Sequence, residues 1–196
     1  HYLDGTFPSE WIADMGQMGI LGMVIPEENG CAGMSDMAYG VVCRELERGD
    51  SGRRSFASVQ GPLSMHPTHK SGTEEQRQKY PPGMPTGELI GCFGLTEPDY
   101  GSNPGGIITK AEDKGDHYLL NGAKMWITNG GIADIAVIWA MDDDGPARGF
   151  LVPIDTTGYV AHDVGRKMSM RTPVTSDQVL EEVRVSADSV LPDARG

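Results

Sequence analysis

The sequence predicts an α+β fold: a helical N-terminal domain followed by an antiparallel β-barrel or sandwich. Before about Gly87, apolar residues recur with helical spacing, and after it they alternate with a period of two residues. Turn-forming residues separate the alternating segments, as in compact antiparallel folds. We therefore expect a helical domain at residues 1–87 and a β domain at residues 88–196.

Start and stop signals define the helices of the first part. Ser35 is a suitable N-cap for the second helix, and Thr73 with Gln76 fits a capping box that opens the last one. Pro62 should bend or shorten the third helix, because proline lacks an N–H and crowds the preceding turn. The predicted helices begin after Pro8, span residues 36–48 and 53–65, and begin again after Thr73.

Short alternating segments predict the strands of the second part. The dipeptide Asn121-Gly122 is typical of a type I′ turn, so we expect a hairpin there. Residues 142–146 are a polar turn. The predicted strands span residues 90–95, 106–112, 117–120, 124–128, 135–141, 149–154, 159–164 and 178–185.

Composition limits the classes of partner. The chain has 28 acidic and 16 basic residues, and this net charge of −12 argues against nucleic acid or an anionic membrane as a partner. A phosphate-bearing ligand is not excluded, because local backbone donors act at short range. Arg166, Lys167 and Arg171 either face the nucleotide end of such a ligand or lie on the rim of the barrel. Three unevenly spaced cysteines indicate reduced, mostly buried thiols of an intracellular protein.

The sequence contains weak metal-site patterns, and we predict no metal. His66 and His69 have a helical spacing, but Pro67 lies between them and no carboxylate or cysteine has a fitting position. The run 142–144 lacks the alternating ligands and the terminal Glu of a calcium loop. Both patterns are therefore interpreted as surface features.

Two segments carry most of the functional information. In the first, an apolar run ends at Leu95 and is followed by Thr96-Glu97-Pro98 and then by the turn Gly101-Ser102, which exposes backbone N–H groups and hydroxyls. In the second, residues 124–130, Trp126 lies two positions before Thr128. Taken singly, Trp126 would be a core aromatic residue and the threonines ordinary strand residues.

In order and spacing, the two segments resemble the flavin-binding signature of the acyl-CoA dehydrogenase family, and are most similar to its glutaryl-CoA dehydrogenases. The resemblance implies FAD as the cofactor, with Thr96 at the flavin ring, Trp126 stacked on it and Thr128 near its reactive nitrogen. The family has Asp where this chain has Asn103, and we expect its side chain still to cap the turn. The implied cofactor residues are Phe93, Gly94, Leu95, Thr96, Gly101, Ser102, Trp126, Ile127 and Thr128.

The same resemblance suggests the substrate. Glutaryl-CoA dehydrogenases hold the distal carboxylate of their substrate with an Arg-Ser pair that matches Arg54-Ser55, and Ser102 lies where the family holds the thioester arm. A guanidinium can bind such a carboxylate bidentately. The alternative interpretation is that Arg54 pairs on a helix surface.

The resemblance also implies what lies outside this chain. Family members begin with more helix before the position of His1, so residues 1–87 match a partial N-terminal domain. Family members also continue, through a linker that residues 191–193 resemble, into a C-terminal four-helix domain that is absent here. That domain supplies the Glu base, so we expect no catalytic residue among residues 1–196. The expected activity is FAD-dependent α,β-dehydrogenation of an acyl-CoA, with decarboxylation of glutaryl-CoA to crotonyl-CoA and electron transfer to an electron-transfer flavoprotein. We expect a homotetramer when full length, in the cytoplasm or, in a eukaryote, the mitochondrial matrix. The alternatives are a dehydrogenase for another short acyl-CoA and a non-catalytic flavin- or acyl-CoA-binding fragment.

Overall fold

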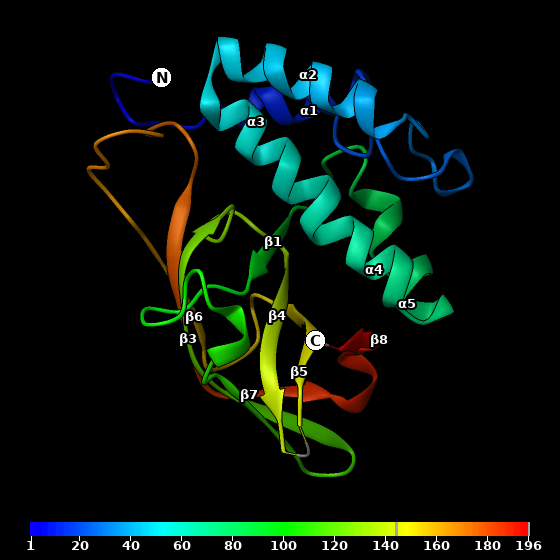
Figure 1. The fold of residues 1–196 in the computed structure, drawn as a ribbon, viewed down its shortest axis with the longest axis vertical. Coiled ribbons are helices and arrows are strands. Elements are labelled where there is room, and N and C mark those ends of the chain that lie inside the picture. Colours follow the sequence, from blue (N-terminus) through cyan, green and yellow to red (C-terminus); the bar gives the residue numbers. More distant parts are fainter. Residues whose placement is uncertain (144, 196) are drawn as a thin grey trace.

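The computed structural model describes residues 1–143 and 145–195, so the predicted polar turn at 142–146 includes one residue, Asp144, outside the described part. Figure 1 shows the helices gathered at one end of the molecule and most strands at the other. Within the described residues, no helix is long and apolar enough to cross a membrane. The predicted fold class, helices followed by a β domain, is confirmed.

The predicted helix signals act as expected. The Ser35 hydroxyl accepts the Ala38 N–H at 3.3 Å, and Thr73 and Gln76 form both bonds of the capping box. The helical elements are α1 (Glu10–Gln17), α2 (Asp36–Gly49), α3 (Ser51–Ser58), the π-helical segment η2 (Val59–Met65), α4 (His66–Ser71) and α5 (Glu74–Lys79), with short 3₁₀ turns η1 (Glu27–Asn29) and η3 (Pro81–Gly83).

Pro62 neither stops nor shortens its helix. The chain continues from α3 through η2 into α4 as one long helical rod (Figure 1). The rod widens to π-helical geometry around Pro62, and at its end the His66 N–H donates to the carbonyl of Gly61, five residues earlier. A wider turn makes room for the proline ring and its missing donor.

The β region forms one mixed sheet. In the described residues its strand order is β6-β7-β3-β2-β4-β5-β8, with β1 paired to β4 beside that path. The pairs β1·β4 and β2·β4 are parallel, so the expectation of a wholly antiparallel sheet is wrong for these two pairs. Alternation locates strands but contains no information on their direction. The strands are β1 (Gly91–Gly94), β2 (Lys110–Asp113), β3 (His117–Thr128), β4 (Ile135–Asp142), β5 (Ala147–Pro153), β6 (Tyr159–Asp163), β7 (Thr175–Ser186) and β8 (Val190–Arg195).

The predicted hairpin at Asn121-Gly122 is wrong, because β3 runs through this dipeptide without turning. Its partner is the equally long β7, and a bulge at this point gives Asn121 two bonds to Glu182. The Asn121 amide donates to Glu182 Oε1 at 2.7 Å, and the Glu182 N–H donates to Asn121 Oδ1 at 2.8 Å. Gly122 has a φ of +155°, and a Cβ there would lie 2.5 Å from Thr109 Oγ1. The glycine therefore serves close packing of backbones rather than a turn.

The predicted linker at residues 191–193 is also wrong, because these residues belong to β8, which pairs with β5. Leu191 is fully buried, whereas Pro192 is exposed. Proline is tolerated in an edge strand because its missing N–H faces away from the partner. Pro192 made this segment look like a linker in the sequence, but the burial of Leu191 and the pairing with β5 show that it is a strand.

One buried side chain joins the two regions. Gln60, in η2, has no solvent exposure, and its amide donates to the carbonyls of Met84 at 2.9 Å and Leu89 at 2.7 Å. Its Oε1 accepts the N–H of Gly91, the first residue of β1, at 2.8 Å. The position of β1, which leads into the first functional segment, is therefore fixed by the helical rod.

Candidate functional site

The two segments singled out from the sequence lie side by side. The Met125 N–H donates to the Thr96 carbonyl at 2.9 Å, and the Lys124 ammonium donates to the Leu95 carbonyl at 3.2 Å. Residues 124–128 are the end of β3, and residues 95–97 follow directly after β1. The segment that follows β1 and the end of β3 therefore lie next to each other and form one surface.

A β-bulge shapes this surface at Trp126. Lys124 pairs with Gln178 and Ile127 with Ser176, so Met125 and Trp126 together face a single residue of β7. Trp126 has a φ of +62°, a conformation that costs free energy for a large side chain. Its side chain is 58% exposed, which excludes the interpretation of Trp126 as a core aromatic residue.

Beneath the surface lies a buried ion pair that the sequence reasoning missed. The ammonium of Lys124 lies 2.8 Å from Glu97 Oε1, and their side chains are 0% and 2% exposed. Burial raises the pKa of Glu97, but hydrogen bonds from Ile108, Lys124 and Thr109 outweigh it and leave the pKa below its ordinary value. Burial lowers the pKa of Lys124, which Glu97 partly opposes. The only sequence signal for this pair was Lys124 itself, a charged residue at the start of the predicted strand 124–128.

After Thr96 the chain makes a tight turn. The N–H groups of Glu97 and Tyr100 donate to each other's carbonyls at 3.1 and 3.2 Å. Gly101 and Ser102 are exposed, and a Cβ on Gly101 would meet no atom within 4 Å among the described residues. Asn103 precedes a 3₁₀ turn (η4, Pro104–Gly106) but makes no side-chain cap bond, so the expected cap is wrong; its backbone carbonyl accepts the Gly106 N–H at 3.1 Å instead.

Some of the predicted cofactor-binding residues do not face the surface beside Thr96 and Trp126. Gly94 faces the interior, since a Cβ there would lie 2.6 Å from Ile138 Cδ1, and Ile127 is buried in the main core. The Phe93 ring packs edge-on against Trp139, with ring centroids 6.2 Å apart. Phe93 and Leu95 line a small, almost wholly apolar cavity of 180 Å³ together with Pro104, Gly105, Trp139 and Ala147. The side chains of the set therefore do not all face one space.

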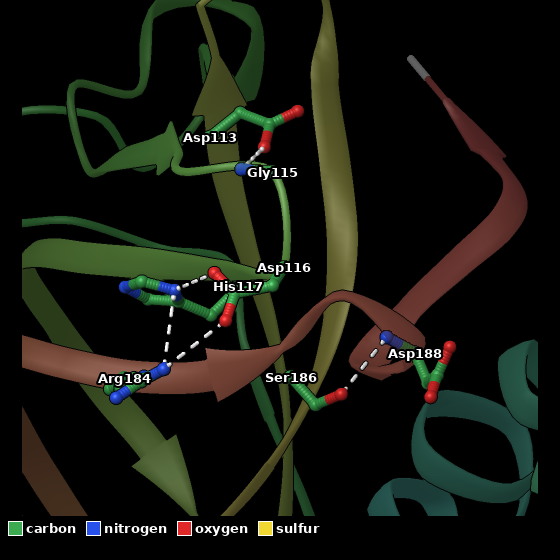
Figure 2. Close-up of polar contacts among 7 residues, drawn as sticks. All are labelled: Asp113, Gly115, Asp116, His117, Arg184, Ser186 and Asp188. Carbon is green, nitrogen blue, oxygen red and sulfur yellow. Dashed lines mark hydrogen bonds and ion pairs between the residues drawn. The ribbon is translucent and has the colours of Figure 1, made fainter.

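A second polar cluster lies at the other end of β3 (Figure 2). His117 Nδ1 lies 2.6 Å from Asp116 Oδ1, and Arg184 Nη2 lies 3.5 Å from Asp116 Oδ2. The Asp116 side chain is 76% exposed. The nearby Ser186 hydroxyl accepts the Asp188 N–H at 3.3 Å and so caps a 3₁₀ turn (η5, Ala187–Ser189). The cluster therefore consists of exposed contacts beside turns, and the Ser186 hydroxyl already serves as the cap of η5.

Family models match both regions. The model described as the acyl-CoA dehydrogenase N-terminal domain matches residues 1–88, and the one described as the acyl-CoA dehydrogenase middle domain matches residues 92–183. The chain belongs to the acyl-CoA dehydrogenase family. It carries the N-terminal and middle domains of that family.

Individual relatives agree with this assignment. The human mitochondrial short-chain specific acyl-CoA dehydrogenase is 36% identical over 94% of this chain and 46% of its own length. A glutaryl-CoA dehydrogenase of Mycobacterium smegmatis, solved with FADH2, is 52% identical with a TM-score of 0.96, covering 100% of this chain and 50% of that chain. A glutaryl-coenzyme A dehydrogenase in complex with glutaryl-CoA is 32% identical with a TM-score of 0.91, covering 97% and 50%. The chain thus spans about half the length of the relatives it matches.

The Arg-Ser pair of this chain lies in the helical region, on α3. Arg54 Nε forms an ion pair with Glu47 Oε2 of α2 at 2.7 Å. A hydrogen bond from Ser51 and then that from Arg54 lower the pKa of Glu47. Ser55 is 3% exposed, and its hydroxyl has no hydrogen-bond partner in the described residues. Arg54 thus pairs across two helices, as the alternative interpretation expected, while Ser55 has an unused polar atom.

Arg53, Lys167 and Arg171 each have a partner within the described residues. The Arg53 guanidinium lies 3.8 Å from the centroid of the Trp11 ring, a cation–π contact. Lys167 donates to Thr175 Oγ1 at 2.7 Å, and Arg171 Nη2 donates to the Leu3 carbonyl at 3.0 Å. Lys167 therefore joins its loop to the start of β7, and Arg171 joins that loop to the N-terminal segment.

Proposed function

We propose that this chain forms the flavin-binding and acyl-binding parts of an FAD-dependent acyl-CoA dehydrogenase that acts on glutaryl-CoA. The observation that carries the proposal is the bulge that turns Trp126 out of β3 directly beside the Thr96 turn. Support comes from the FADH2 complex of the M. smegmatis glutaryl-CoA dehydrogenase, the 52% identical neighbour. We propose residues 1–87 and 88–196 as the limits of the two domains.

The exposed residues of the site fit a flavin. Trp126 offers an indole face, Thr96 and Thr128 offer half-buried hydroxyls, and the turn at Gly101-Ser102 offers free space and a hydroxyl. A planar, hydrogen-bonding ring needs this combination. In our proposal Trp126 stacks on the ring, the two threonines hydrogen-bond its edge, and Ser102 binds both cofactor and substrate. FAD, when bound, supplies a hydride acceptor.

The remaining members of the cofactor set contribute differently. Phe93 and Leu95 form an apolar wall, and Gly94 and Ile127 pack inward beneath the site. We propose that these inward positions hold the shape of the two strands rather than touch the flavin.

We propose that Arg54 and Ser55 bind the distal carboxylate of glutaryl-CoA. The Nε of Arg54 is paired with Glu47, which leaves its two terminal nitrogens as a fork for a carboxylate. The unpartnered hydroxyl of Ser55 is a second donor on the same helix. The glutaryl-CoA complex of a 32% identical relative supports this substrate class.

We propose the rest of the reaction from the resemblance to glutaryl-CoA dehydrogenases. A carboxylate base would take the α proton, and the hydride from the β carbon would pass to bound FAD. The unsaturated product would then lose carbon dioxide and take up a proton to give crotonyl-CoA. We propose that the base is supplied from outside residues 1–196, that an electron-transfer flavoprotein receives the electrons, and that the full protein is a homotetramer. We propose the cytoplasm, or the mitochondrial matrix in a eukaryote, as its location.

One experiment tests the proposal against its alternatives. The full protein should bind FAD and reduce a dye with glutaryl-CoA faster than with butyryl-CoA. Faster reaction with butyryl-CoA would favour a short-chain dehydrogenase, the alternative supported by the 36% identical human relative. Flavin binding with no turnover of either would favour a binding protein, and no flavin binding would refute the proposal.

A further inference from the structure

The buried pair of Lys124 and Glu97 encloses one residue of the proposed site. The ammonium of Lys124 binds the carbonyl of Leu95 at 3.2 Å and the carboxylate of Glu97 at 2.8 Å. These two groups belong to the residues on either side of Thr96. The carbonyl of Thr96 itself accepts the N–H of Met125 at 2.9 Å. Three consecutive residues of the turn are thus bonded to two consecutive residues of β3.

Glu97 extends this connection to a third segment. Its Oε2 accepts the Ile108 N–H at 2.7 Å, and its Oε1 accepts the Thr109 N–H at 2.9 Å as well as the Lys124 ammonium. Residues 108 and 109 follow the exposed turn that carries Gly101 and Ser102. The carboxylate therefore fixes the end of that turn to the strand that leads to Trp126.

Stability alone does not account for such a pair. Two fully desolvated charges gain little over well-packed apolar residues of the same volume, because desolvation offsets most of their attraction. What an ion pair adds is a defined geometry, since its hydrogen bonds fix the direction of approach. In this molecule the bonds join the residues on either side of Thr96 to Lys124, two positions before Trp126 in β3.

We propose that Lys124 and Glu97 are positioning residues that hold Thr96 and Trp126 at the spacing needed to bind the flavin. The pair touches neither cofactor nor substrate and acts through these two neighbours. This inference rests on the proposed function, because it assigns the pair to the FAD site.

Two variants of the full protein separate positioning from simple stability. Lys124→Met leaves a buried carboxylate without its cation, so it should lower the melting temperature and weaken FAD binding. The double variant Lys124→Met with Glu97→Gln removes both charges, but the Gln amide keeps one acceptor oxygen where Glu97 offers two to the N–H groups of Ile108 and Thr109. It should therefore regain only part of the melting temperature. It still lacks the bond from the ammonium to the Leu95 carbonyl. We expect its FAD dissociation constant to stay roughly tenfold above that of the original protein, the effect of one lost hydrogen bond, with an altered visible flavin spectrum.

A matched control comes from a pair elsewhere in the β domain. Arg148 and Asp142 form an ion pair at 2.9 Å with side chains 15% and 17% exposed. Arg148→Met should lower the melting temperature without changing the flavin spectrum. If the neutral double variant regains both stability and original FAD affinity and spectrum, the pair is only structural and the inference is overturned. If the unaltered protein binds no FAD, the proposed function fails instead.

Discussion

Replacing Arg54 by Gln tests the substrate assignment most directly. If its terminal nitrogens hold the distal carboxylate, Arg54→Gln removes a charge-assisted pair, a loss of about 1.5–3 kcal/mol. The value of kcat/KM for glutaryl-CoA should fall roughly ten- to a hundredfold. That for butyryl-CoA should hardly change, because butyryl-CoA has no carboxylate at that end.

The same structure predicts that the variant folds. The Arg54–Glu47 pair has side chains 33% and 44% exposed, so its loss should lower the free energy of unfolding by less than about 1 kcal/mol. Urea unfolding measures this. The neighbouring Arg53→Gln is the matched control, since it removes a stack on Trp11 rather than a carboxylate-binding group. Equal losses of kcat/KM for both substrates in Arg54→Gln would refute the carboxylate role.

Three further predictions concern the flavin site, the domain junction and the surface cluster. Trp126→Ala should weaken FAD binding and alter the flavin spectrum while leaving the melting temperature nearly unchanged, because the ring is 58% exposed; an unchanged spectrum would contradict stacking. Gln60→Leu leaves the Leu89 carbonyl and the Gly91 N–H without their partner, while the Met84 carbonyl keeps its bond from the Gly87 N–H, so the free energy of unfolding should fall by about 2–5 kcal/mol in urea titrations, and a loss below about 1 kcal/mol would contradict its joining role. The hydrogen bond from His117 lowers the pKa of Asp116, so its stabilising effect is present above the ordinary Asp pKa and lost as pH falls through the lowered value. An NMR titration should show this low pKa and its return toward the ordinary range in His117→Ala.

Local signals in the sequence predicted most of the helical part. Ser35 and the Thr73–Gln76 box act through bonds between residues only three apart, so composition and spacing suffice to find them. The start of α3 at Ser51 was missed although its cap is also local: the Asp50 side chain accepts the Gly52 N–H at 2.6 Å. Asp50 also accepts the Thr172 hydroxyl at 2.9 Å, a contact between distant residues that no local pattern contains.

The β part shows where local reasoning ends. Alternation located strands, but the choice of partner is a long-range property, and so a turn-like dipeptide at Asn121-Gly122 lies within a long strand. The bulge at Trp126 depends on β7 contributing one residue fewer than β3, which no single segment reveals. The burial of Lys124 likewise required the structure, because a lysine in a strand is usually assigned to the solvent face.

Under the proposed assignment, the junction at Gln60 fixes the distance between the two ends of the substrate site. From Arg54 to Gln60 the helix rises about 9 Å, and from Gly91 to Thr96 the extended chain covers about 17 Å. Because the fully buried Gln60 side chain bonds to the N–H of Gly91, the helical rod and β1 are held in a fixed relative position. Under the proposed assignment, the span between the carboxylate-binding end and the reacting end is therefore set by backbone. A site of this kind would select dicarboxylic acyl chains by their length as well as by their charge.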